Sequence, residues 1–387
     1  MEGSWRALEI RHWSGYETLR RESTALDERR ASLRNRHLRI STFHGCHVGE
    51  TDRAPSPCVH EIMACSRGRI PRADRWRLGA PTPLWGLPDA ALAGRLAVGL
   101  PGNHQRWMDE RTVTHDGHEL WVGDQPGPGP GIVLLHGFPD NHHLYDRVLP
   151  YLRGRHVVAF DFLGWGDSDK PRNYDYTADA QTRELESVIR ALGLDRVILV
   201  AHDASGPPAI DWALAHPDQV ERLVLLNTYY CRMDSLRPPE AIWLFSTPVV
   251  RPVARWVARR FHDQVFRRMY FWQVGRFFRD PAVRDEFLPL LYEQFERRPS
   301  AHRAFFALNE DLRPTLRERA HRRKDLLRFE RPVRILFGNA DPYLNSDVAR
   351  DISHLFPRAE LRFVEGARHF VQMDEPRRVA QEITRDA

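Results

Sequence analysis

The sequence predicts an α/β protein in which a mostly parallel sheet is flanked by helices and interrupted by a long helical insertion. Short apolar runs, typical of strands buried on both faces, recur between residues 131 and 366. Segments with helical spacing separate them, as right-handed crossovers between parallel strands require. Between the fourth and fifth apolar runs lie about a hundred residues, roughly 229–328, with a helical and aromatic-rich pattern.

The elements follow one another in a regular order. The segment RTVTHDGHELWVGD predicts a hairpin whose turn is Asp116-Gly117. The predicted buried strands are GIVLLHG (131–137), HVVAFDFLG (156–164), RVILVAHD (196–203), VERLVLLN (220–227), VRILFGNAD (333–341) and AELRFVEG (359–366). Helical spacing runs over 177–192 and ends at Gly193, and a second helix is expected after the third strand, through Ala215.

The chain divides into three regions by composition. Residues 1–102 are rich in Arg, Ser and His with little periodicity, and we expect a poorly ordered N-terminal extension. Residues 103–228 and 329–387 form the predicted core. Residues 229–328 are a predicted helical cap, or lid, because so long an insertion is not a simple loop. Its stretch RWVARRFHDQVFRRMYFW is also basic and amphipathic, which would suit a membrane surface, although packing on the sheet domain is the simpler interpretation.

Composition narrows the function classes. The chain is 42% hydrophobic and 28% charged, which is ordinary for a globular protein. The net charge of +5 comes almost entirely from arginine and follows no nucleic-acid-binding motif, so no nucleic acid partner is expected. The four cysteines imply no disulfide framework, and the His and Cys residues of 44–65 match no standard zinc spacing, so no metal is expected. No transmembrane segment and no signal-peptide core are seen, which predicts a cytoplasmic protein.

The segment VILVAHDASG has the features of a nucleophile elbow, a sharp strand-to-helix turn that exposes its central residue. With Asp203 at the centre, the positions that must be small are Ala201, Ser205 and Gly206. Ser205 is the alternative centre, but two prolines would then stand where close contact is needed. A helix N-cap is the purely structural interpretation of Asp203. The flanking residues favour Asp203 as the nucleophile.

Residues at other strand ends complete the constellation. Asp341 follows the fifth buried run and His369 follows the sixth, so nucleophile, acid and histidine occur in the order expected of such a site. The rival acid position, after VERLVLLN, holds Asn227, and an amide cannot stabilise an imidazolium charge as a carboxylate does. Asp203, Asp341 and His369 are therefore the predicted catalytic residues.

The motif HGFP follows the first buried run, where half of an oxyanion hole would be built. Phe138 is the predicted donor within it, through its backbone N–H, and Ala204 is the predicted second donor. His136, Gly137 and Pro139 are the remaining residues of this motif.

Together HGFP, DFLGWGDSDKP, AHDASG, FGNADPY and EGARHF resemble the epoxide hydrolase and haloalkane dehalogenase branch of the α/β-hydrolase superfamily. The resemblance covers roughly residues 107–387. It implies an α/β-hydrolase fold, a helical cap inserted after the sixth strand, a buried active site between cap and core, and no cofactor. Members of this branch commonly carry an aromatic residue after the nucleophile, and Ala204 departs from that pattern.

The nucleophile's chemistry narrows the substrate. A carboxylate that attacked a carboxylic ester would give an anhydride, whereas attack on a saturated carbon gives an alkyl ester that water can hydrolyse. An epoxide hydrolase-like enzyme is expected, acting on a small hydrophobic organic substrate and water as a monomer or homodimer. A haloalkane or haloacid dehalogenase and a non-enzymatic small-molecule binding protein are the alternatives. Tyr270, Tyr292 and Trp272 of the predicted cap are candidate leaving-group donors.

Overall fold

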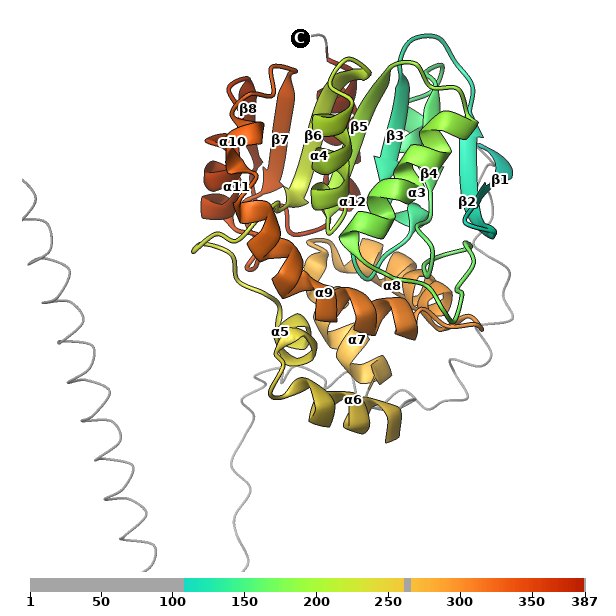
Figure 1. Ribbon diagram of the computed structural model, residues 1–387, viewed down its shortest axis with the longest axis vertical. Helices are drawn as coiled ribbons and strands as arrows, with labels where there is room; N and C mark the ends of the chain where they lie inside the picture. Colours follow the sequence, from blue (N-terminus) through green and yellow to red (C-terminus); the bar gives the residue numbers. More distant parts are fainter. Residues whose placement is uncertain (1–107, 261–265, 386–387) are drawn as a thin grey trace, which may run out of the picture. The chain divides into compact units, whose positions relative to one another are not determined.

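Eight strands form one mostly parallel sheet in the part of the chain that the structure, a computed structural model, describes: residues 108–260 and 266–385 (Figure 1). The strands are β1 (Asp109–His115), β2 (His118–Gln125), β3 (Gly131–Leu135), β4 (Val157–Phe160), β5 (Val197–Asp203), β6 (Val220–Thr228), β7 (Val333–Gly338) and β8 (Ala359–Val364). Their order across the sheet is β1-β2-β4-β3-β5-β6-β7-β8. Only the pairings of β1 with β2 and of β2 with β4 are antiparallel, which confirms the predicted fold class.

The predicted hairpin and the six predicted strands are present, but β8 is not the buried strand expected, because it is the last strand of the sheet and only Val364 is fully buried. Asp116 and Gly117 both have a positive φ, of 50° and 78°, as a two-residue turn between antiparallel strands requires. All residues of β3, β4, β5 and β7 are buried, which is why each reads as a continuous apolar run. Several strands end before the corresponding run does, because their last residues leave the sheet and enter the loops at its carboxyl edge.

Helices cover the sheet. They are α3 (Ala178–Ala191), α4 (Gly206–Ala215), α11 (Ser346–Ser353), α12 (Val371–Asp374) and α13 (Pro376–Thr384), with the short 3-10 helices η2 (His142–Tyr145) and η3 (Leu149–Tyr151). The α3 helix starts where predicted, because Thr177 caps it by accepting a hydrogen bond from the Ala180 N–H, and it is followed by Gly193 at a φ of 62°. The α3 and α4 helices lie together in front of the sheet in Figure 1.

A group of helices lies between β6 and β7 in the sequence. These are α5 (Glu240–Ser246), α6 (Arg251–Arg260), α7 (Arg267–Val274), η5 (Gly275–Phe277), α8 (Pro281–Glu296), α9 (His302–Ala320) and α10 (Arg323–Leu326). Figure 1 shows α5 to α9 gathered below the sheet, with α6 farthest from it. Their common core is aromatic and consists of Phe245, Phe266, Phe295, Phe305 and Phe306. We refer to residues 229–328 as the insertion.

Some of the predictions from the sequence do not concern the sheet and its helices. The predicted N-terminal extension, residues 1–102, and the His and Cys residues of 44–65 lie outside the described residues. Among the helices that the structure describes, none is both long enough and apolar enough to cross a membrane.

Candidate active site

A sharp turn after β5 places Asp203 at the carboxyl edge of the sheet. Asp203 has a φ of 49°, a left-handed conformation that side chains other than glycine seldom adopt. Two glycines make the turn possible. A Cβ on Gly206 would lie 2.0 Å from Thr228 Oγ1, and a Cβ on Gly137 would lie 2.7 Å from Asp203 Cβ. A side chain at either glycine would therefore clash with the residues packed around this turn.

Ser205, the alternative nucleophile, has its hydroxyl turned into the protein. The hydroxyl lies within hydrogen-bond distance of the Leu135 and His202 carbonyl oxygens, at 3.1 and 2.8 Å, and it accepts from the His202 N–H at 2.9 Å. The side chain is fully buried. These contacts hold the elbow together and leave Ser205 no path to a substrate.

The two oxygens of the Asp203 carboxylate have different surroundings. Oδ2 accepts a hydrogen bond of 3.1 Å from the Phe138 N–H, and the Ala204 N–H also donates to this carboxylate. Burial raises the pKa of Asp203, while His369 and the two N–H donors oppose that rise. Oδ1 lies 4.0 Å from His369 Nε2, too far for a hydrogen bond. Oδ2 is thus held by a backbone N–H, whereas Oδ1 faces His369.

His369 and Asp341 lie together behind this carboxylate. His369 Nδ1 donates to Asp341 Oδ2 at 2.7 Å, which turns Nε2 toward Asp203. The other Asp341 oxygen accepts from the N–H groups of Tyr343 and Leu344, at 2.9 and 3.2 Å. The structure therefore brings the three predicted catalytic residues together at one edge of the sheet.

A cavity of about 510 Å³ opens onto these residues. Its inner wall includes Phe138, Asp203, Tyr229, Phe277 and His369. Its outer wall is made by the segment after β6 and by the α9 helix, which are joined where the Arg232 N–H donates to the Leu316 carbonyl oxygen at 3.0 Å. The site is thus a pocket between strand ends and the insertion.

The comparison with known protein families matches residues 130–376 to the alpha/beta hydrolase fold. This range covers both sides of the site and most of the chain. The chain is an α/β-hydrolase.

Two curated relatives and one solved structure illustrate its neighbours. This α/β-hydrolase is 28% identical to the putative hydrolase LipZ of Mycobacterium tuberculosis over 68% of its own length and 90% of the relative's. It is 28% identical to haloalkane dehalogenase 2 of Mycobacterium bovis, over 72% of its length and 93% of that protein's. The epoxide hydrolase CorEH has the same fold, with a TM-score of 0.57, 21% identity and coverage of 71% and 96% of the two chains. The resemblance to the epoxide hydrolase and dehalogenase branch is confirmed.

Asn227 has a positioning role that the sequence comparison of acid positions did not foresee. Its Nδ2 donates to Asp341 Oδ2 at 2.9 Å, and its Oδ1 accepts from the Gly338 N–H at 2.8 Å. Asn227, which stands at the rejected acid position, therefore orients Asp341 in this α/β-hydrolase. The carbonyl oxygen of His369 is held in turn by His202 Nε2 at 3.1 Å.

The charge state of His369 is set by carboxylates. Burial lowers its pKa, but Asp341, followed by Asp203 and Asp140, outweighs burial and raises the pKa to about 9. His369 is therefore an imidazolium at neutral pH. Asp140, beside the HGFP motif, is fully buried, and neither of its oxygens has a hydrogen-bond partner among the described residues. Burial, followed by the Asp203 charge, raises the pKa of Asp140 well above its usual range.

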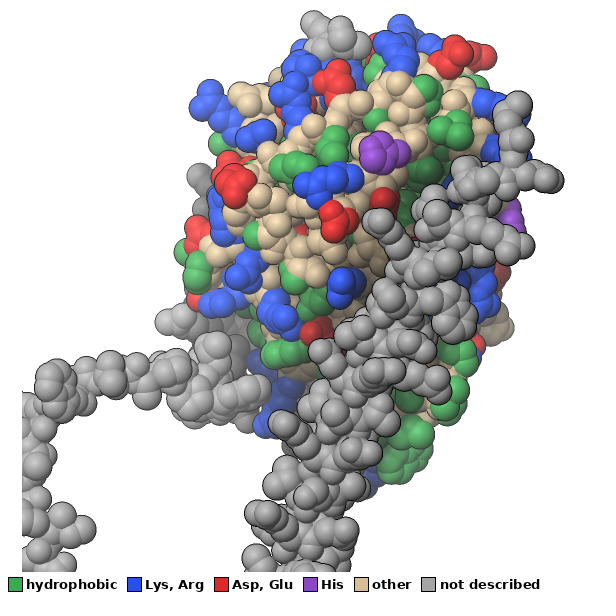
Figure 2. Space-filling model, turned by 90° about the vertical axis from the view of Figure 1, so that its left-hand side faces the viewer, with side chains coloured by type: hydrophobic (Ala, Val, Ile, Leu, Met, Phe, Trp, Pro, Cys, Tyr) green, Lys and Arg blue, Asp and Glu red, His purple; other side chains and the backbone are tan. Residues whose placement is uncertain are grey.

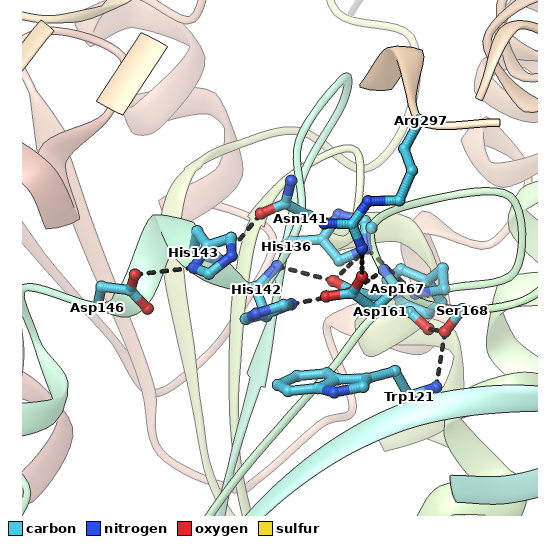
Figure 3. Close-up of polar contacts among 12 residues, drawn as sticks. Trp121, His136, Asn141, His142, His143, Asp146, Asp161, Asp167, Ser168 and Arg297 are labelled. Atoms are coloured by element: carbon cyan, nitrogen blue, oxygen red, sulfur yellow. Dashed lines mark hydrogen bonds and ion pairs between the residues drawn. The ribbon is translucent and has the colours of Figure 1, made fainter. Parts of the chain in front are cut away.

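A polar network holds the loop that carries the Phe138 N–H (Figure 3). Asp161 is its centre and accepts at 2.8 Å from both the backbone N–H and Nδ1 of His142. His142 also stacks on Trp121, with ring centroids 3.8 Å apart. His136 of the HGFP motif accepts from the Phe162 N–H at 3.1 Å. These contacts therefore fix the backbone of the loop that carries the Phe138 N–H.

His142, Asp161 and Asp167 lie close enough to resemble a metal site, but their groups are already engaged. Both Asp161 oxygens accept hydrogen bonds, including one of 2.9 Å from the Asp167 N–H. Arg297, at the end of α8, forms an ion pair with Asp167 (Figure 3). The cluster is therefore a polar joint between the sheet domain and the insertion.

The candidate leaving-group donors from the sequence lie away from the cavity. Tyr270 is buried and its hydroxyl donates to the Pro139 carbonyl oxygen at 3.2 Å, while Tyr292 packs against it. Trp272 is exposed to solvent. None of the three is among the described residues that line the cavity. Tyr229 and Tyr343 line it instead, and both lie in loops after strands rather than in the helical stretch that the sequence pattern singled out.

Proposed function

We propose that this α/β-hydrolase is an epoxide hydrolase-like enzyme that forms an alkyl ester on Asp203. The observation that carries the proposal is the asymmetry of the Asp203 carboxylate, with Oδ2 held by the Phe138 N–H and Oδ1 facing His369. An ionised carboxylate needs no base to attack a saturated carbon, and the ester it forms has its carbonyl oxygen already in an oxyanion hole.

In the first step Oδ1 attacks an epoxide carbon, the C–O bond breaks, and the epoxide oxygen leaves as an alkoxide. We assign Tyr229 as the group that gives this alkoxide a proton. Tyr229 lines the cavity, and no hydrogen bond of its hydroxyl is found within the described residues. Tyr343 is less suited, because its hydroxyl already donates to Glu240 at 2.8 Å. Burial and the nearby Asp203 raise the pKa of Tyr229, so its hydroxyl carries a proton before the reaction.

In the second step His369 acts as the base. Alkylation removes the negative charge of Asp203 and with it part of the stabilisation of the imidazolium. The proton that His369 then releases restores Tyr229. Neutral His369 takes a proton from water, whose oxygen attacks Cγ of Asp203, and the negative charge that develops on Oδ2 is stabilised by the N–H groups of Phe138 and Ala204. Collapse of this intermediate breaks the Cγ–Oδ1 bond, and the departing alkoxide takes the proton of the hydroxyl newly added to Cγ. The diol is released, Asp203 is again a carboxylate, and His369 keeps the proton it took from water.

Dehalogenation is a second candidate, favoured by the 28% identity to haloalkane dehalogenase 2 across most of both chains. The covalent step would be the same, with halide as the leaving group. A halide needs hydrogen-bond donors but no proton. The two candidates therefore differ in what they require of Tyr229.

Exposure of the His369→Gln protein to matched epoxides and haloalkanes tests the proposal. Without the base the alkyl ester should persist, because only its hydrolysis requires proton removal from water. Intact mass spectrometry should show a gain equal to the whole epoxide, and peptide mapping should place it on Asp203. A gain equal to the alkyl group without halogen would instead establish dehalogenation. If neither class of compound gives an adduct, the ester mechanism is wrong.

The Tyr229→Phe substitution separates the two leaving groups. In the His369→Gln background, we expect adduct formation from epoxides to slow about 100-fold, the usual contribution of a positioned acid. Adduct formation from haloalkanes should change far less. Tyr343→Phe is the matched control, since it removes another hydroxyl from the cavity wall. Equal effects of both substitutions on epoxides would remove Tyr229 from its assigned role.

A further inference from the structure

The outward face of the α6 helix is apolar and exposed. Val249, Val253 and Trp256 have 86%, 65% and 63% of their surface accessible to solvent. The helical hydrogen bonding begins before α6 itself, since Arg251 N–H donates to the Thr247 carbonyl oxygen, so the three residues follow one helical stripe. Such large apolar side chains seldom stand together in water without a partner.

Buried contacts fix which side of α6 faces outward. Ala254 and Ala258 are buried, and Arg251 and Arg255 reach Glu310 of α9 at 2.9 and 3.1 Å. At 100° per residue these contacts place the stripe on the opposite side of the helix. Figure 2 shows hydrophobic side chains, in green, gathered at the lower end of the molecule, where α6 lies in Figure 1.

The charge on this face of α6 indicates which kind of partner would bind there. Arg259 is exposed at the edge of the stripe, and residues 247–260 contain no acidic residue. A second copy of the chain, docked on this face by a twofold axis, would bring arginines toward arginines. An anionic lipid surface instead offers opposite charge to the arginines and an apolar boundary to the stripe.

We propose that this face, defined as Val249, Val253, Trp256 and Arg259, binds anionic membrane surfaces. Trp256 and the valines enter the headgroup and acyl boundary, while the Arg259 guanidinium stays among the lipid phosphates. Two further tryptophans, Trp243 on α5 and Trp272 on α7, are also exposed on neighbouring helices of the insertion. The insertion would then meet the lipid in which hydrophobic substrates dissolve.

Vesicle flotation of the full chain tests this proposal. We expect binding to vesicles of equal parts phosphatidylcholine and phosphatidylglycerol, weaker binding to phosphatidylcholine alone, and loss of the difference at high salt. Val253→Ser combined with Trp256→Ser should weaken binding about tenfold or more, and Arg259→Gln should weaken binding to the anionic vesicles only.

Tyr151→Ser combined with Leu327→Ser is the matched control, because these side chains are similarly exposed but lie outside the α6 face. The control should bind vesicles like the unmodified chain. The proposal is overturned if the unmodified chain binds neither vesicle, or if both double variants bind equally. It is also overturned if ultracentrifugation shows a dimer that the α6 variant abolishes while vesicle binding is unchanged.

Discussion

The Asp203→Asn protein is expected to lose about 10⁴-fold or more of its turnover and to form no adduct with any electrophile. An amide oxygen is a far weaker nucleophile than a carboxylate oxygen, and Asp203 is the cavity carboxylate that lies beside His369. The side chain keeps its size, so the tight turn between Gly137 and Thr228 should be preserved. Single-turnover kinetics and intact mass measure the two effects separately.

Ser205→Ala is the companion substitution two residues away. It removes a hydroxyl that bonds only to the backbone of the elbow, so we expect a loss of about 1–3 kcal/mol of stability with the chemical steps retained. If Ser205→Ala abolished turnover while Asp203→Asn remained active, the nucleophile would be serine and the reaction class would change to acyl transfer.

The Asp341→Asn protein is expected to alkylate readily but to hydrolyse its ester about 10³–10⁴-fold more slowly. Alkylation uses Asp203 and Tyr229, whereas hydrolysis needs a histidine that is oriented and stabilised as an imidazolium by Asp341. Rapid-quench measurement of the two half-reactions should show a burst of ester followed by slow release. Asp347→Asn, on the exposed side of α11, is the control and should behave like the unmodified protein. Equal slowing of both half-reactions by Asp341→Asn would contradict the assignment of Asp341 to the hydrolysis step.

The same substitution should change how stability depends on pH. The pKa of His369 is raised from 6.5 to about 9 in the folded protein, so its contribution is fully present below pH 6.5 and is lost as pH rises through 9. That contribution amounts to about 3 kcal/mol. Denaturant unfolding on both sides of this window should show the loss in the unmodified protein and much less of it in Asp341→Asn.

The sequence predicted those parts of the site that depend on strand ends. Asp203, Asp341 and His369 lie at or after the ends of β5, β7 and β8, and parallel strands end at one edge of a sheet, so their meeting follows from topology. Gly206 was predictable because the elbow tolerates nothing larger at that position.

Roles that depend on where a side chain points or on what it contacts in the folded protein could not be predicted from the sequence. Asn227 was rejected as the triad acid because it is an amide, and its role in orienting Asp341 depends on the register between β6 and β7. Tyr270 and Tyr292 were reasonable donor candidates by position, but helical spacing alone does not say whether a hydroxyl faces the cavity or the aromatic core. The pKa of Asp140 is raised only because folding removes the carboxyl from water and places it near Asp203.

The asymmetry of Asp203 has a consequence for the origin of the product's atoms. If Oδ1 forms the ester and water adds to Cγ, the oxygen that leaves with the product in the first turnover comes from the protein. A single turnover in water enriched in oxygen-18 should therefore label the Asp203 peptide and leave the first diol unlabelled at that position. Only in later turnovers would solvent oxygen reach the product, with the aspartate acting as its carrier.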